Sequence, residues 1–186
     1  MITSGSNKLF ISIAAGIKLE FLNRFLGESS AVIRVMPNVA CSVQESMTVV
    51  CPSYNCPQDK LDLCIEIFTA AGRCRLLPES LFDVATAVCG SGPAFFCTII
   101  EGLVAGAVKM GMPVDIAQEL ATQTMKGTAS MILDGPVHPA IMRDRVTTPG
   151  GCTIDGLARM ESGSIRSTLL ETIEQCAKRA KAMGDK

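Results

Sequence analysis

The sequence predicts two architectures in succession, a small α/β segment over residues 1–77 and an all-helical segment over residues 78–186. Two observations support this prediction. Short apolar runs alternate with amphipathic stretches up to Leu77, as strands alternate with helices. After Pro78 the strand signals disappear, and apolar residues recur every three or four positions.

The α/β segment divides at glycines and prolines, which end strands and helices. A buried strand over residues 9–15 is expected to end at Gly16, and a short helix over residues 19–26 to end at Gly27. Strands are then expected over residues 31–36 and 47–51, an amphipathic helix from Pro57 to Gly72, and a strand over residues 73–77.

The helical segment contains six apolar-periodic stretches, at about 79–88, 92–111, 114–134, 138–146, 152–162 and 164–183. Residues 94–112 are apolar nearly all round, and only Glu101 and Lys109 interrupt them. These charges argue against a membrane span, so we expect a buried core helix. About 110 residues cover such a helix poorly, which predicts an obligate dimer.

Composition excludes several classes of protein. Seventeen Lys and Arg against eighteen Asp and Glu, with no Trp and one Tyr, argue against nucleic-acid binding. The N-terminus lacks the pattern of a signal peptide, so we expect a cytoplasmic protein. Nine irregularly spaced cysteines and a single histidine, His138, predict neither a disulfide framework nor a metal site.

A strand–helix–strand segment followed by a helical bundle is typical of the C-terminal two thirds of a dinucleotide-dependent dehydrogenase. We therefore interpret residues 1–77 as the C-terminal remnant of a Rossmann-like domain. The Gly-x-Gly-x-x-Gly fingerprint that cradles a pyrophosphate does not occur in this sequence. The related run at residues 90–95 ends in Phe95 and introduces the helical segment.

The stretch DRVTTPGGCT at residues 144–153 is the strongest candidate for a binding site. Gly150 and Gly151 permit a tight loop, and the helix that follows adds unpaired N–H groups and its positive dipole end. Hydroxyl groups of Thr147, Thr148 and Thr153 could add hydrogen bonds to a small carboxylate. An ordinary helix–helix turn with a threonine cap explains the same residues equally well.

Two other candidates have simpler explanations. Glu79 stands in the first turn of a helix, where an acidic residue is favoured whether or not it has a further function. His138 precedes Pro139 at a helix start, which is typical of a structural position.

Six motifs in order along the chain resemble pyrroline-5-carboxylate reductases. They are ISIAAG (11–16), VIRVMPN (32–38), GSGPA (90–94), VKMGMP (108–113), HP (138–139) and VTTPGGCTI (146–154). The resemblance implies an enzyme that reduces the C=N bond of 1-pyrroline-5-carboxylate to L-proline with NADPH or NADH. It also implies a homodimer or higher homo-oligomer joined through a helical dimerisation domain.

The resemblance also implies roles for individual residues. The substrate carboxylate would be held by residues of the glycine loop, which are Thr148, Gly150, Gly151, Cys152 and Thr153. Thr153 would be the catalytic proton donor to the ring nitrogen, and Glu79 an acidic group near the substrate. The cofactor would be contacted by Ile13, Ala14, Ala15 and Asn38.

Members of this family begin with a Rossmann half that carries the glycine fingerprint, and we expect this sequence to be part of a longer parent. The cofactor preference, NADH or NADPH, would be set in that half. A mitochondrial location applies if a targeting segment precedes it. Two alternatives stay open, a non-catalytic dimerisation protein that assembles with intact reductase subunits, and another imine or keto-acid reductase of similar domain plan.

Overall fold

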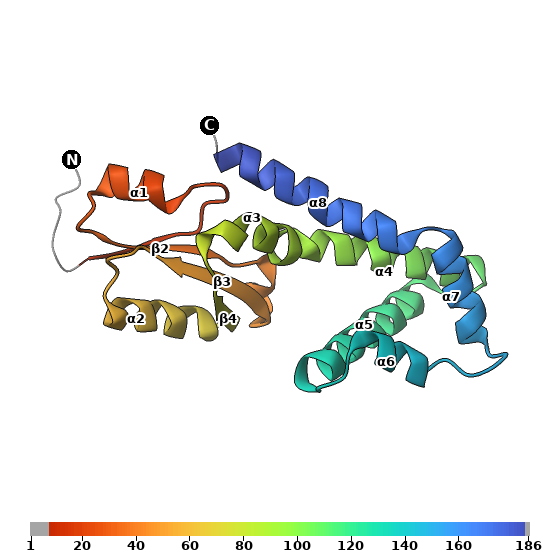
Figure 1. Ribbon diagram of the computed structural model, residues 1–186. Helices are drawn as coiled ribbons and strands as arrows, with labels where there is room; N and C mark the ends of the chain where they lie inside the picture. Colours follow the sequence, from red (N-terminus) through yellow and green to blue (C-terminus); the bar gives the residue numbers. More distant parts are fainter. Residues whose placement is uncertain (1–7, 185–186) are drawn as a thin grey trace. The chain divides into compact units, whose positions relative to one another are not determined.

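The protein is described by a computed structural model over residues 8–184, and it divides into two compact units (Figure 1). The sheet unit comprises the described residues up to Pro93 together with those from Glu171 onward. The helical unit comprises Ala94–Leu170. Residues 1–7, on which the expectation about a signal peptide rests, lie outside the described residues.

The sheet unit is built on four strands in the order β1 (Leu9–Ser12), β2 (Ala31–Met36), β3 (Ser46–Pro52) and β4 (Gly72–Leu76). β1 pairs with β2 in parallel, β2 with β3 antiparallel, and β3 with β4 in parallel. The short helical turn η1 (Val39–Val43) connects the antiparallel pair. All six residues of β2 are buried, so this strand forms the centre of the unit.

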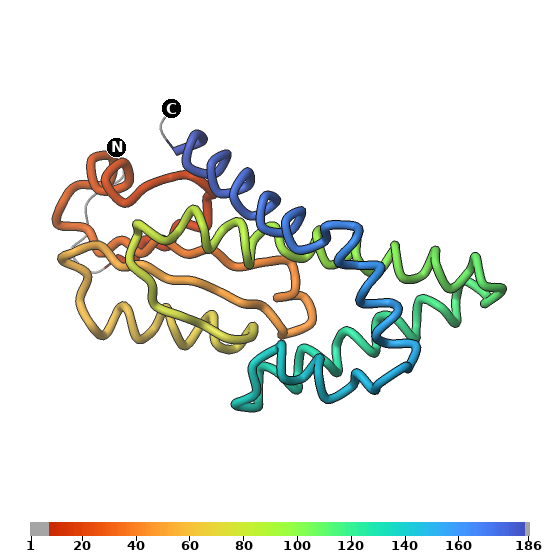
Figure 2. Tube along the Cα trace, turned by 45° about the vertical axis from the view of Figure 1, so that its right-hand side comes forward, coloured from red at the N-terminus to blue at the C-terminus, as the bar shows by residue number. Residues whose placement is uncertain are grey.

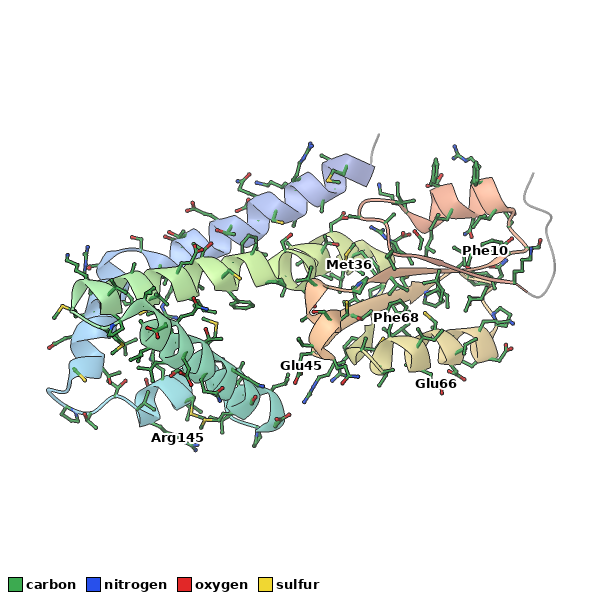
Figure 3. The ribbon with its side chains drawn as sticks, turned by 180° about the vertical axis from the view of Figure 1, so that it is seen from behind. Phe10, Met36, Glu45, Glu66, Phe68 and Arg145 are labelled. Atoms are coloured by element: carbon green, nitrogen blue, oxygen red, sulfur yellow. The ribbon has the colours of Figure 1, made fainter. Side chains whose placement is uncertain are left out.

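Helices α1 (Leu19–Leu26) and α2 (Gln58–Thr69) cover the two faces of the sheet (Figure 1). Leu19 of α1 shares one apolar cluster with Val32 and Phe82, whereas Leu61 and Cys64 of α2 share the other with Ile33. The alternation of side chains along β2 supplies both clusters. Figure 3 shows Phe68 of α2 on the side of the sheet and Glu66 on the opposite side.

Two boundaries in this unit differ from the predicted ones. β1 ends at Ser12 and not at residue 15, because the chain leaves the sheet for a turn in which Gly16 has a φ of +78°. α2 ends at Thr69, and Gly72 begins β4. Gly72 has a φ of +144°, and a Cβ there would lie 2.2 Å from the carbonyl oxygen of Ser46. The glycine therefore permits close strand pairing at this point.

The helices that follow are η2 (Glu79–Leu81), α3 (Phe82–Ala85), the π turn η3 (Thr86–Gly90), α4 (Gly92–Lys109), α5 (Val114–Asp134), α6 (Pro139–Arg145), α7 (Cys152–Ser162) and α8 (Ile165–Gly184). Their order can be followed in Figure 2. The six predicted stretches are confirmed within about two residues, except that the first is divided among η2, α3 and η3. The predicted α/β and all-helical composition is thereby confirmed.

The prediction that residues 94–112 form a buried core helix is wrong for the single chain. Ala117 is the only buried residue between Ala94 and Leu170, all of which the structure describes. The helical run Glu79–Lys109 is long and apolar enough to cross a membrane, but a single helix of this kind is weak evidence for one. Within its apolar stretch of 18 residues, only 17% is buried. Its apolar surface thus lies uncovered within one chain.

Candidate functional site

The glycine loop, residues 146–151, joins α6 to α7 within the helical unit. Gly150 has a φ of +67°, and Gly151 is the N-cap of α7 with no side-chain cap. A Cβ at residue 151 would lie 2.4 Å from Thr148 Oγ1. The threonine-capped turn considered above is therefore not formed.

The first backbone N–H groups of an α-helix have no partner within the helix, and in α7 no side chain caps them either. These are the N–H groups of Cys152, Thr153 and Ile154. They form the positive end of the helix dipole, which favours an anion. The loop thus offers a small anion site made of backbone donors.

The three threonine hydroxyls of this region differ in their engagement. Thr147 Oγ1 donates to the carbonyl of Arg143 over 2.8 Å, and it thereby satisfies a carbonyl in the last turn of α6. Thr153 is half-buried, and among the described residues its hydroxyl has no hydrogen-bond partner. Arg143 is paired with Asp144 at 2.8 Å. Thr148 Oγ1 lies beside Gly151, the N-cap of α7, so the hydroxyls of Thr148 and Thr153 both stand at the uncapped helix start.

The predicted cofactor residues lie in the sheet unit. Ile13, Ala14 and Ala15 follow β1 and are exposed, with 60% of Ile13 accessible. Asn38 follows β2, where its amide donates to the carbonyl of Cys89 and accepts from the N–H of Ala40, each over 3.0 Å. β1 and β2 are parallel, so both sets lie at the carboxyl edge of the sheet, where α/β folds bind ligands.

Glu79 is engaged within the sheet unit. Its Oε1 accepts a hydrogen bond from the N–H of Leu19 over 2.7 Å and another from Arg34 Nη1 over 2.9 Å. Arg34 is 2% exposed, and its guanidinium lies 4.7 Å from the ring centroid of Phe82. Arg34 was not among the predicted site residues, although a lone charge within an apolar strand was a signal for a buried partner.

The three buried cysteines of the sheet unit, Cys51, Cys64 and Cys89, have thiol pKa values that burial raises. Burial raises the pKa of Cys51, the Glu79 carboxylate raises it further, and Arg34 acts in the opposite direction. Burial, with Cys74 and Cys56 nearby, raises the pKa of Cys64 to about 11. Within residues 8–184, no group of three or more His, Cys, Asp or Glu side chains is placed to hold a metal ion.

The predicted site residues thus form two groups. Thr148, Gly150, Gly151, Cys152 and Thr153 lie together in the helical unit, whereas Ile13, Ala14, Ala15, Asn38 and Glu79 lie in the sheet unit. A sheet edge suited to a ligand and an all-helical unit with an anion loop define a class of protein, the two-domain dinucleotide-dependent oxidoreductases.

Comparison with known proteins gives the particular family. A family profile described as pyrroline-5-carboxylate reductase dimerisation matches residues 79–183. A pyrroline-5-carboxylate reductase of Schizosaccharomyces pombe is 50% identical over 95% of this chain and 62% of its own length. One from Methanosarcina acetivorans is 41% identical over 97% of this chain and 67% of its own length. The chain belongs to the pyrroline-5-carboxylate reductase family.

Solved structures agree with this assignment. The crystal structure of a Plasmodium falciparum pyrroline carboxylate reductase with NADP bound has a TM-score of 0.91 and 32% identity, covering 96% of this chain and 72% of that one. A pyrroline-5-carboxylate reductase from Coxiella burnetii has a TM-score of 0.91 and 30% identity, covering 98% of this chain and 67% of that one. The chain spans about two thirds of the length of the relatives that it matches. The prediction of a Rossmann-like remnant followed by a helical dimerisation domain is confirmed.

Proposed function

We propose that this chain serves the NAD(P)H-dependent reduction of 1-pyrroline-5-carboxylate to L-proline. The observation that carries the proposal is the uncapped start of α7 behind Gly150 and Gly151. It places backbone donors where a small carboxylate can bind without a dedicated arginine. The helix dipole alone contributes roughly 0.3 to 2 kcal/mol to such an anion.

In this proposal Thr148, Gly150, Gly151, Cys152 and Thr153 surround the substrate carboxylate. The Thr153 hydroxyl, which has no partner among the described residues, is the proton donor to the ring nitrogen. The reaction needs a hydride on the carbon of the C=N bond and a proton on its nitrogen. A positioned donor of that proton typically accelerates such a step about 10² to 10⁴-fold.

The cofactor edge is the end of β1 and β2. Ala14 and Ala15 are small and exposed beside the apolar Ile13, which fits a flat nicotinamide ring. Asn38 is held there by its bonds to Ala40 and Cys89. NADPH or NADH, when bound, supplies the hydride. In this proposal Glu79 is the acidic group near the substrate. The hydrogen bonds from Leu19 and Arg34 both end on its Oε1 and not on its Oε2.

The helical unit is proposed to associate with a second copy of the chain. An open hollow of about 620 Å³ between α4 and α5 is lined mainly by apolar side chains, among them Leu103, Met112 and Leu120. Such a surface is typical of a homodimer interface that completes the core of each partner.

The proposed location of the protein is the cytoplasm.

Titration calorimetry with L-proline tests the substrate site. Thr153→Ala should weaken L-proline binding about 2 to 10-fold, the usual value of one lost hydrogen bond. Thr122→Ala, at an exposed threonine of α5, is the matched control and should bind L-proline as the unchanged chain does. Equal affinities for all three proteins would remove Thr153 from the site, and no binding to any of them would contradict the proposal.

A second candidate function follows from the uncovered helical unit, in which Ala117 is the only buried residue. The chain would act as a non-catalytic partner of reductase subunits that bind the cofactor. Mixing the two and analysing the products by native mass spectrometry tests this idea. Hybrid oligomers would support it, whereas a mixture of homo-oligomers alone would exclude it.

A further inference from the structure

Helix α1 begins without a cap from its own sequence. Lys18 occupies the N-cap position and makes no side-chain cap hydrogen bond. The N–H of Leu19, the first residue of α1, instead donates to Glu79 Oε1 over 2.7 Å, from 60 residues further along the chain. A carboxylate at this position satisfies an orphan donor and complements the positive end of the helix. Glu79 thus caps α1 from a distance.

Arg34 fixes the position of this remote cap. It stands on β2, where every residue is buried, and its Nη1 donates to Glu79 Oε1 over 2.9 Å. Its Nε and Nη2 are buried and have no acceptor among the described residues, so Glu79 is the acceptor on which the guanidinium depends. The Phe82 ring, itself fully buried, packs against the guanidinium at 4.7 Å. An arginine enclosed in this way has little freedom to move.

Glu79 and Arg34 lie at the end of the segment that joins β1 to α1, residues 13–18. We call this segment the cofactor loop, because it contains the proposed cofactor contacts. The loop is also supported in its middle, at Gly16. A Cβ added to Gly16 would lie 3.1 Å from Met183 Cβ and 3.2 Å from the backbone nitrogen of Gly184, at the end of α8. The loop is therefore held by β1 at its start, by α8 in its middle and by Glu79 at its end.

We infer that Arg34 is a positioning residue that acts through Glu79 to fix the cofactor loop. The inference rests on the proposed function only in taking Ile13, Ala14 and Ala15 as the cofactor contacts. Arg34 does not need to touch the cofactor. Arg34 is held in the central strand β2, and its hydrogen bond to Glu79 Oε1 keeps that oxygen in place at the N–H of Leu19, where α1 begins.

Hydrogen exchange of the whole chain tests the inference without any need for activity. Arg34→Met should raise amide exchange about tenfold over residues 13–22, the range expected when a charged hydrogen bond is lost. Exchange in β2 and β3 should stay unchanged. Glu79→Gln keeps the shape and removes the charge, so it should raise exchange in the same segment, and it provides the test if Arg34→Met does not fold.

Arg24→Met is the matched control. Arg24 lies on α1 itself and pairs with Glu20 at 3.1 Å, but both side chains are about four-fifths exposed. This variant should leave the exchange of residues 13–18 unchanged, because exposed ion pairs of this kind contribute little. Unchanged exchange of the loop in Arg34→Met and Glu79→Gln would overturn the inference. A uniform rise across β2 and β3 would also overturn it, because it would indicate a purely structural role.

An NADPH titration measures the consequence for the cofactor. Arg34→Met should weaken NADPH binding about tenfold, as expected when a positioned loop is lost. Unchanged NADPH affinity beside a loosened loop would overturn the link to the cofactor. If the unaltered chain binds no NADPH, the cofactor part of the proposed function fails, and hydrogen exchange alone decides whether Arg34 positions the loop.

Discussion

The sheet unit and the helical unit differ in where their apolar side chains lie. β2 is buried along its whole length and supplies two apolar clusters, one on each face of the sheet. Between Ala94 and Leu170, by contrast, Ala117 is the only buried residue, although most residues of α4 are apolar. The sheet unit thus completes its core within one chain, and the helical unit needs a partner to do so.

Replacing one phenylalanine in each unit should give the largest contrast. Phe82→Ala should destabilise the sheet unit by about 3 to 5 kcal/mol, because Phe82 is fully buried and its removal leaves a cavity beside Arg34. Phe96 of α4 is 56% exposed, so Phe96→Ala should change the urea midpoint of the sheet unit little and weaken self-association instead. Urea unfolding and analytical ultracentrifugation measure the two effects. Equal loss of stability in both variants would contradict the comparison.

Two glycines with positive φ sharpen the comparison within the sheet unit. Gly72→Ala should cost about 3 kcal/mol, because its Cβ would collide with the Ser46 backbone at 2.2 Å as well as adopting an unfavourable φ. Gly27→Ala has the unfavourable φ of +93° but open space around it, so it should cost about 1 kcal/mol. Thermal unfolding of the two variants provides the test. A cost at residue 27 as large as that at residue 72 would show that close strand pairing is unimportant.

The buried cysteines predict a smaller, pH-dependent difference. The pKa of Cys64 is raised by burial to about 11, above the ordinary value of 9.0 that applies in the unfolded chain. The unfolded state therefore loses its proton first, and the stability that the neutral thiol contributes is lost as pH rises from about 9 to 11. The urea midpoint of the sheet unit should fall between pH 8 and pH 10.5.

Cys64→Ala provides the control for this effect, since its urea midpoint should fall less over the same pH range. Exposed cysteines offer a parallel measurement at pH 8. Cys97 and Cys152, both exposed, should react with a thiol reagent well before Cys64 does. Early reaction of Cys64 would show that the core of the sheet unit opens readily.

Local sequence patterns located most of the secondary structure. β2, α1, α5 and α7 have the predicted limits, because glycines, prolines and apolar periodicity act over a few residues. The errors have local causes as well. Residues 13–15 continue the apolar pattern of β1, so no local pattern indicates that the chain leaves the sheet at Ser12. The geometry of the glycine loop was accessible to the same kind of reasoning, since Gly150 and Gly151 stand directly before a helix.

By itself, the sequence determined the order of the elements, the glycine loop before α7 and the motifs of the family. Tertiary structure alone decided that Arg34, Glu79 and Leu19 meet, and that the apolar surface of α4 is uncovered in one chain. A lone arginine in a buried strand indicates that an acidic partner exists, but the chain has eighteen Asp and Glu residues. Which of them is the partner depends on contacts across 45 and 60 residues of chain, and local patterns do not encode such distant pairings.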